Sequence, residues 1–418
     1  MSTSSEPPQQ GVEVSDVEKE LHRMLHTKLR GLRYQPLSIA EALKKLSQYL
    51  HVAIEIGTYM YTFGDKNVAK HIASLENVVD EIAYQLLIHM SVVVGHNVDE
   101  AWKAIPIYIY VLGVDKVMDS FKDLAMSVLR DQRPSSSVAS YLSHLSDVLV
   151  LPVPGDKVEG SSARDLEEIF SVEVLTVLRR GEWIINPSNE IIQRNDVVYV
   201  KGFKDNISEM CRNLGIQITQ PVEPPNQLKP LLQHIDSMTD MLVLLNDLAH
   251  YQLKAQDPQL SEELLELEAF FDNLRNTVTA MLISTSELSV DDKAALLRLV
   301  TRLEDASDAL TYIVTIPAQD EYRDVLSELI ESSDERASIF VCRKSISMEK
   351  LYRALDDWGA MPLALRKNSE WIAVTPYNMA KLHANEGDRV LIIYPLNSEE
   401  EVLSTLRILG LEKAPGFS

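Results

Sequence analysis

Pairs of acidic residues four positions apart are the first feature of this sequence that could do chemistry. The pairs are Glu76 with Asp80, Asp115 with Asp119, Glu268 with Asp272, and Glu304 with Asp308. Residues four apart share one face of an α-helix, so each pair would present two hard oxygen ligands together. In each half of the chain, the two pairs either converge in one groove as a divalent-cation site or form a solvated acidic flank. They lie at the edges of the apolar stripes, where carboxylates stay hydrated, so we predict weak divalent-metal binding or none.

Basic and turn-forming residues near predicted strand ends are the second candidate set. The residues are Arg179, Arg180, Asn186 and Pro187 in the first half, and Arg366, Lys367 and Pro376 in the second. Arginine can hold a phosphate through two parallel hydrogen bonds, so these turns could bind a small phosphate-bearing ligand. The alternative is an ordinary hairpin with a charged turn. Trp183 and Trp371 occupy matching places and are expected to anchor a core or an interface.

The sequence offers no motif for catalysis. It contains no GxGxxG, GxxxxGK[ST], GxSxG, HExxH or CxxC pattern, and its ten histidines are scattered. The only two cysteines, Cys211 and Cys342, stand in unrelated contexts and are expected to be buried thiols in a reducing compartment. Because no base or nucleophile accompanies the carboxylates, we expect no catalytic residues and no enzymatic activity.

Composition restricts the partners. The chain has 418 residues and a net charge of −22, so we expect no nucleic-acid binding. A hydrophobic share of 45% indicates a folded protein of two to four domains. The longest apolar stretches, 83–95 and 104–114, are shorter than the ~20 residues of a spanning helix. The first residues, MSTSSEPPQQ, lack the features of a signal peptide. A cytoplasmic protein that does not itself span a membrane is therefore expected.

The chain divides into alternating helical and mixed segments. Apolar residues recur every three or four positions after Ile39 and again after Leu228, which predicts three antiparallel helices in each region. Asp65 and Asn67 offer a helix start. Runs rich in β-branched residues then predict strands. The predicted parts are a disordered tail (1–33), a helical bundle (34–133), an α+β domain (146–217), a Pro-rich linker (218–227), a second bundle (228–333) and a second α+β domain (336–413).

The second half of the chain repeats the first. LRRGEWIINP (178–187) corresponds to LRKNSEWIAVTP (365–376), and NDVVYV (195–200) corresponds to GDRVLII (387–393). These matches occur in the same order, which indicates an internal duplication. Each small sheet needs cover for a face or an edge, so we expect the two α+β units to pack against each other within one chain.

These motifs resemble two known families. The acidic pairs, with VDKVMDSFKDLAMSVLR (114–130) and LEDASDALTYIV (303–314) as third-helix signatures, resemble PhoU-like domains. The segment from Pro154 through VLRRGEWIINPSNEIIQRNDVVYVKG (177–202) resembles TrkA-C, the C-terminal subdomain (RCK_C) of regulators of potassium conductance. RYQPLSIAEAL (33–43) is similar to the lead-in of PhoU–TrkA-C fusion proteins found beside archaeal potassium channels. The expected fold is thus α+β multidomain, with two PhoU-like antiparallel three-helix bundles alternating with two small TrkA-C domains.

The resemblance implies a cytosolic, non-enzymatic regulator of cation transport, potassium in particular, that acts on a membrane channel or transporter subunit. TrkA-C domains of the family pair and bind ligands, including cyclic di-AMP, at the pair interface. A duplicated chain could form this pseudo-dimer within itself, and a homodimer stays open. The nucleotide-binding RCK subdomain has no counterpart here, so gating by NAD or ATP is not expected. The alternative is a PhoU-type regulator of phosphate signalling and transport that binds metal through the acidic helix motifs.

Overall fold

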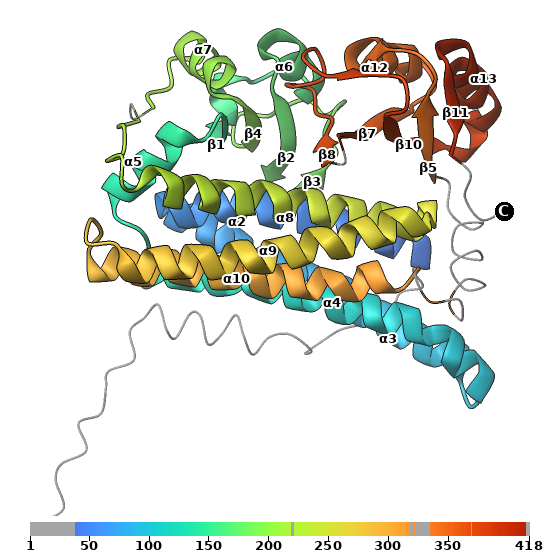
Figure 1. The fold of residues 1–418 in the computed structure, drawn as a ribbon, viewed down its shortest axis with the longest axis horizontal. Coiled ribbons are helices and arrows are strands. Elements are labelled where there is room, and N and C mark those ends of the chain that lie inside the picture. Colours follow the sequence, from blue (N-terminus) through green and yellow to red (C-terminus); the bar gives the residue numbers. More distant parts are fainter. Residues whose placement is uncertain are drawn as a thin grey trace, which may run out of the picture.

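The computed structural model describes residues 38–218, 221–317, 319, 322, 335–368 and 370–414. The predicted disordered tail, 1–33, lies outside the described residues. Figure 1 shows long helices on one side of the molecule and two small sheets, each with its own short helices, on the other.

Six long helices form the helical layer. They are α2 (Ile39–Phe63), α3 (Lys66–Val94), α4 (Val98–Leu129), α8 (Lys229–Ala255), α9 (Pro258–Ser284) and α10 (Val290–Thr315). The side chain of Asp65 accepts hydrogen bonds from the backbone N–H groups of Asn67 and Val68, which caps α3 where the sequence predicted a helix start. Helices α2, α3 and α4 pack against one another, as do α8, α9 and α10.

The two sets of three helices share one core. Helix α4 lies along α10, and buried side chains of both halves belong to a single apolar cluster. Gly113 on α4 permits this close approach, because a methyl group there would lie 3.0 Å from the backbone oxygen of Ala309 on α10. The helical regions, predicted as separate bundles, therefore form a continuous layer.

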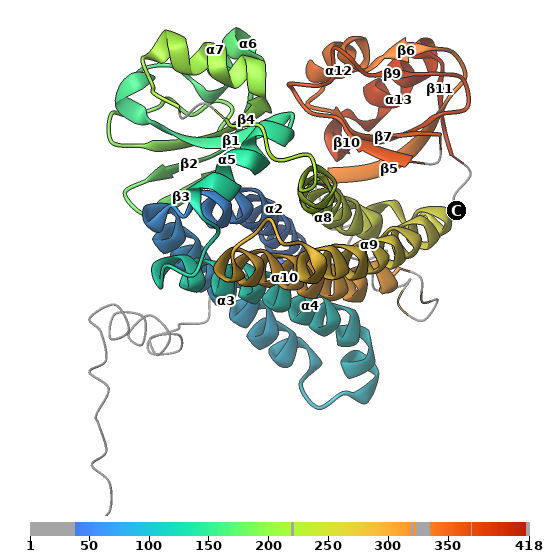
Figure 2. The ribbon, with the colours of Figure 1, turned by 60° about the vertical axis from the view of Figure 1, so that its left-hand side comes forward.

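The ends of α3 and α4 project beyond this layer (Figures 1 and 2). Val93, Val98 and Trp102 are exposed there. By length and composition, α3 is also the one helix in the described part of the chain that could cross a membrane. Core helices of soluble proteins pass the same test, and α3 packs along α2 and α4.

The first mixed unit is an antiparallel sheet with helices on one face. Its strands are β1 (Val148–Pro154), β2 (Glu173–Arg179), β3 (Glu182–Ile185) and β4 (Val197–Phe203), in the order β1-β4-β2-β3. Its helical elements are η1 (Gly155–Lys157), α6 (Ala163–Phe170) and α7 (Lys204–Leu214). Ser162 and Asp165 form a capping box at the start of α6, as its sequence predicted a serine cap. A further helix, α5 (Ser136–Leu145), joins the first bundle to this unit and was not predicted.

The second unit repeats this strand order. Its main sheet contains β5 (Glu335–Cys342), β7 (Met361–Lys367), β8 (Glu370–Ala373), β10 (Arg389–Pro395) and β11 (Leu411–Lys413), in the order β11-β5-β10-β7-β8. Strands β6 (Ile346–Ser347) and β9 (His383–Ala384) form a separate pair, and the helical elements are α12 (Met348–Asp356), η3 (Leu396–Ser398) and α13 (Glu399–Leu409). The order β5-β10-β7-β8 corresponds to β1-β4-β2-β3 of the first sheet.

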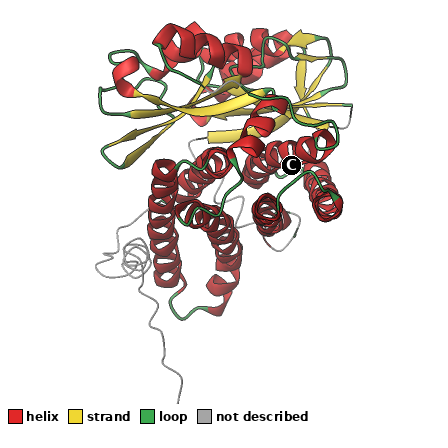
Figure 3. Cartoon of the chain, turned by 90° about the vertical axis from the view of Figure 1, so that its left-hand side faces the viewer, coloured by secondary structure: helices red, strands yellow, loops and turns green. Residues whose placement is uncertain are grey.

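The molecule thus has three layers. Figure 3 shows the sheets between the long helices on one side and the short helices on the other. Each sheet therefore has one face buried under its own helices and one face turned toward the helical layer. Charged side chains on the sheets point toward the long helices and form ion pairs with charged side chains of those helices.

Candidate functional site

The interface between the first sheet and the long helices contains a buried ion pair. Lys201 on β4 donates a hydrogen bond to Glu55 on α2, and their side chains are only 10% and 5% exposed. Burial disfavours the charge on Lys201, but Glu55, Tyr377 and Glu173 outweigh it and hold the pKa of Lys201 well above its usual range. The lysine is therefore a fixed positive charge that joins the first sheet to the first bundle.

A second charged pair joins the two helical halves beside it. The Nδ1 atom of His51 on α2 lies 2.8 Å from Oδ1 of Asp247 on α8. Burial lowers the pKa of His51, but Asp247, with smaller contributions from Glu55 and Glu173, raises it to about 9. The imidazole is therefore protonated at neutral pH, and the pair forms a salt bridge.

The two mixed units contact each other directly. The rings of Phe203, at the end of β4, and Tyr377 meet edge to face with centroids 5.3 Å apart. Nζ of Lys381 lies 3.8 Å from the centre of the Phe203 ring, and Arg164 on α6 forms a 2.6 Å ion pair with Asp356 at the end of α12. These contacts connect the first sheet unit to the second within one chain (Figure 2).

The matching tryptophans anchor the sheets on the helices. Trp183 is buried and stacks on Tyr199, whose hydroxyl lies 2.9 Å from Nδ1 of His71 on α3. Trp371 donates from Nε1 to Glu263 on α9 over 2.7 Å. The prediction that both are core or interface anchors is confirmed.

Arg179, predicted to bind phosphate, is held by carboxylates of its own domain. It donates to Asp196 and Glu190, with Nη2 2.9 Å from Asp196 Oδ2, and also to the backbone oxygen of Ile191. Burial opposes the charge on Asp196, but the hydrogen bonds from Arg179 and from Gln193 N–H lower its pKa. Through these contacts, Arg179 holds the loop that precedes β4 in place.

Two of the other predicted ligand residues of the first unit, Arg180 and Asn186, lie on its surface. Arg180 is exposed in the β2–β3 turn with φ of 53°. Asn186 is exposed, also with φ of 53°, and Pro187 is buried beside it. Of this group, Arg180 is the guanidinium that faces solvent.

In the second unit one of the predicted residues, Arg366, faces the helices. Arg366 on β7 forms a 2.8 Å ion pair with Glu263, and Lys367 donates to the backbone oxygen of His383. Pro376 is half-buried. In the described part of the chain, no hydrogen bond or ion pair joins these residues to Arg179, Arg180, Asn186 or Pro187.

One acidic pair of the first bundle, Glu76 with Asp80, is less hydrated than predicted. Glu76 and Asp80 are buried, 2% and 6% exposed, whereas Asp115 is half-buried and Asp119 exposed. Glu76 accepts a hydrogen bond of 2.5 Å from Lys122 on α4. The expectation of wet carboxylates fails here because α4 packs over that side of α3 and supplies a lysine.

In the second bundle the carboxylates converge. Oxygens of Glu268, Asp272 and Asp308 all lie within 4.8 Å of one another, between α9 and α10. Burial and the charges of neighbouring carboxylates raise the pKa of Glu268 and of Asp308. The fourth predicted member, Glu304, is instead paired with Arg275 on α9. Three hard oxygen ligands are thus close enough to share one cation.

Sequence patterns did not identify the pairs Lys201–Glu55 and His51–Asp247. The available signal was the presence of charged residues inside apolar patterns. Glu55 lies on the buried face of α2, His51 lies about one turn before it and is half-buried, and Lys201 follows a β-branched run. Such residues are expected to have a partner when buried. The partners themselves come from distant segments and were not identifiable from spacing.

A protein-family model matches the segment of the chain that forms the first sheet unit. Residues 148–215 match the family model of the TrkA-C domain, which coincides with β1 to α7. This confirms the first of the two predicted TrkA-C domains. Comparison with curated protein sequences gives no match.

Two structures illustrate the similarity to solved structures. They are a crystal structure of the GsuK RCK domain (8% identity, TM-score 0.16, 63% of this chain and 64% of that chain) and the GsuK channel (10% identity, TM-score 0.16, 72% of this chain and 66% of that chain). The chain therefore spans slightly less than two thirds of each of these chains. TM-scores of this size do not establish a shared fold.

Proposed function

We propose that this protein is a cytoplasmic, non-enzymatic regulator of cation transport, with potassium as the transported ion. The observation that carries the proposal is the TrkA-C domain at 148–215. In this proposal, the domain senses a small ligand and the long helices pass its state to a membrane channel or transporter subunit. The buried Lys201–Glu55 pair supports this, because it fixes the sheet to the helical layer.

The second sheet unit completes the sensor in this proposal. Its strand order matches that of the first unit, and Phe203, Tyr377 and Lys381 connect the two. We propose that they act as an intrachain TrkA-C pair produced by duplication, each unit following a PhoU-like helical bundle. The proposed ligand is a small phosphate-bearing molecule, with cyclic di-AMP as the precedent from the resemblance. Arg180 is the better candidate for its phosphate, since Arg179 is held by Asp196 and Glu190.

A second candidate function is favoured by the carboxylates of the second bundle. PhoU-type regulators of phosphate transport are expected to bind metal through such motifs. The convergence of Glu268, Asp272 and Asp308 within 4.8 Å supports this alternative. It differs from the first candidate in the transporter that the protein would contact.

Affinity purification of the tagged full chain from native membranes distinguishes the two candidates. A potassium channel or transporter subunit in the eluate, identified by mass spectrometry and absent from an untagged control, supports the first. A phosphate-transporter subunit supports the second. Recovery of neither, under cross-linking as well, contradicts both.

Calorimetry with cyclic di-AMP tests the sensor. We expect about one ligand per chain and at least roughly ten-fold weaker binding by Arg180→Ala. Arg130→Ala, an exposed arginine at the end of α4, is the matched control and should bind normally. Absence of heat and of a thermal shift at millimolar ligand would remove cyclic di-AMP as the ligand and leave the paired units as a dimerisation platform.

A further inference from the structure

A pocket lies where both helical halves meet the second sheet. It is lined by residues of α2, α4 and α8, by Ile316 after α10 and by Glu335, the first residue of β5. The room inside it for water-sized molecules is about 70 Å³, and the pocket is also open to solvent. A single water needs roughly 10–15 Å³ of such room, so the pocket can admit a small organic ligand in place of several waters.

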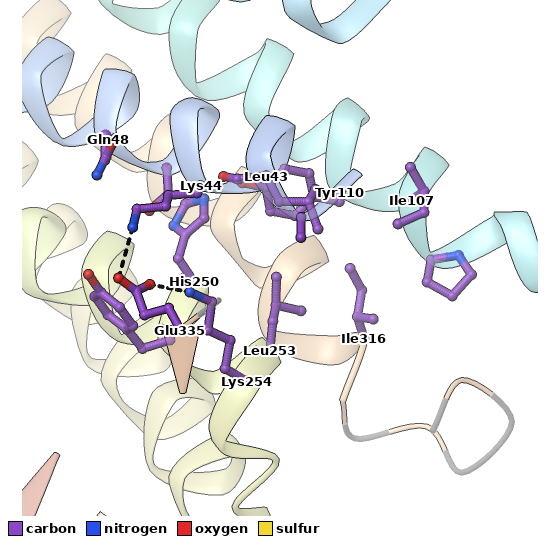
Figure 4. Close-up of a pocket in the computed structure, with 14 residues that line it drawn as sticks. Leu43, Lys44, Gln48, Ile107, Tyr110, His250, Leu253, Lys254, Ile316 and Glu335 are labelled. Carbon is purple, nitrogen blue, oxygen red and sulfur yellow. Dashed lines mark hydrogen bonds and ion pairs between the residues drawn. The ribbon is translucent and has the colours of Figure 1, made fainter. Parts of the chain in front are cut away.

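One end of the pocket is positively charged. Glu335 accepts hydrogen bonds from Lys44, over 2.9 Å, and from Lys254 (Figure 4). Burial opposes ionisation of Glu335, but Lys254 and Lys44 outweigh it and lower its pKa, so the carboxylate is charged. Among the described residues that line this end, two ammonium groups face one carboxylate, so these residues together carry a positive charge.

His250 provides an unused hydrogen-bond acceptor in the same pocket. Its Nδ1 lies 2.7 Å from the backbone oxygen of Asn246 and must donate to it, which leaves Nε2 with a lone pair. The residue is 6% exposed, and Nε2 has no hydrogen-bond partner among the residues that the structure describes. Burial lowers the pKa of His250 to about 4, so the ring is neutral at pH 7. A buried acceptor of this kind favours a ligand with a hydrogen-bond donor, such as a hydroxyl group.

The opposite end of the pocket is apolar. Figure 4 shows Tyr110, Ile107, Leu253 and Ile316 on the side away from Lys44 and Glu335. The ring of Tyr110 meets His250 edge to face with centroids 5.5 Å apart. A ligand that fills the pocket would therefore have a charged head and a hydrocarbon body.

We propose that this pocket binds a small amphipathic hydroxy acid. Its carboxylate would lie beside Lys44 and Lys254, its hydroxyl would donate to Nε2 of His250, and its hydrocarbon chain would pack between α4 and α8. His250 and Lys254 are four residues apart on α8, so the acceptor and the ammonium belong to adjacent turns. The inference does not depend on the sheet units sensing a ligand or on which ion is transported.

Calorimetry on the full chain with three matched probes tests the proposal. The probes are 3-hydroxyoctanoate, octanoate, which lacks the hydroxyl group, and 2-octanol, which lacks the carboxylate. We expect 3-hydroxyoctanoate to bind about ten-fold or more tightly than either of the others. His250→Leu should abolish its advantage over octanoate, and Lys254→Met should abolish its advantage over 2-octanol. Lys103→Met, an exposed lysine on α4, should change neither.

Three results would overturn the proposal. The first is no heat from 3-hydroxyoctanoate at ~1 mM, which corresponds to binding weaker than about 4 kcal/mol. The second is equal affinity for octanoate and 3-hydroxyoctanoate, which tests the acceptor in the unmodified protein even if His250→Leu fails to fold. The third is unchanged binding by Lys254→Met, whose side chain is partly exposed and whose loss leaves the helix core intact.

Discussion

His51 and Asp247 place a histidine of the first half of the chain 2.8 Å from a carboxylate of the second. Asp247 is the largest of the influences that raise the pKa of His51, to about 9 against an ordinary value near 6.5, even though burial lowers it. The protonated imidazole is thus stabilised only when both halves are folded together. This relationship makes the stability of the whole chain depend on pH.

Stability should fall as pH rises from about 6.5 to about 9. Below this window His51 is protonated in both states and the stabilisation is complete; above it the proton is lost from the folded state and the stabilisation is gone. Urea unfolding across the window measures the slope. Asp247→Asn should flatten the curve, whereas His383→Gln, at an exposed site, should leave it unchanged. An equal slope in Asp247→Asn would assign the pH dependence to other groups.

Glu55→Gln should be strongly destabilising, because it leaves Lys201 buried without its main counter-charge. Breaking a buried ion pair costs about 3–5 kcal/mol, whereas replacing both partners by apolar residues is often neutral. Chemical denaturation should therefore show that the double variant Glu55→Leu, Lys201→Met recovers most of the loss. Asp131→Asn, which removes the exposed ion pair with Lys66, is the control and should cause no measurable change. Similar losses in the single and double variants would contradict the argument.

Arg179→Ala should lower stability, whereas Arg180→Ala should not. Removing Arg179 leaves Asp196, 3% exposed, without its bidentate partner, at a cost of about 1.5–3 kcal/mol. Arg180 is exposed, and its substitution should stay within about 0.5 kcal/mol. Thermal unfolding of the two variants checks this contrast. If Arg179→Ala unfolds like the unmodified protein, the arginine is free for a ligand after all.

We expect no tightly bound divalent metal at Glu268, Asp272 and Asp308. Plasma mass spectrometry after dialysis should show no stoichiometric manganese, iron or zinc, and a chelator should leave the melting temperature unchanged. Metal retained through dialysis and lost when Glu304 and Asp308 become Ala would show this prediction wrong. Burial and the charges of neighbouring carboxylates raise the pKa of Asp308, so in the metal-free protein Asp308→Asn should be stabilising at neutral pH.

The sequence predicts local contacts correctly where a residue interacts with its own neighbours along the chain. Asp65 caps α3 and Ser162 caps α6, each through backbone N–H groups two or three residues away. Strands β2 and β4 of the first unit coincide with runs rich in β-branched residues, which are also a local signal. Helix α5 was missed because Ser135, its N-cap, stands in a Pro- and Ser-rich stretch that also indicates a linker.

The sequence does not predict the partners of charged side chains, because the packing of distant segments decides which side chains meet. Glu76 occupies the edge of an apolar stripe, and only the position of α4 brings Lys122 to it. Asp196 follows Arg179 by seventeen residues, and the hairpin between them decides that they meet. The sequence therefore places Arg179 correctly beside a turn, but it does not show that Asp196 occupies the guanidinium that was expected to bind phosphate.

The close approach of α4 to α10 at Gly113 has a consequence for synthesis of the chain. Helix α10 is translated long after α4, with α5, the whole first sheet unit, α8 and α9 between them. The face of α4 that α10 covers therefore stays open on the nascent chain until the second half has left the ribosome. Such a surface is prone to aggregation in the interval, so expression of the first half alone should require a chaperone or yield insoluble protein.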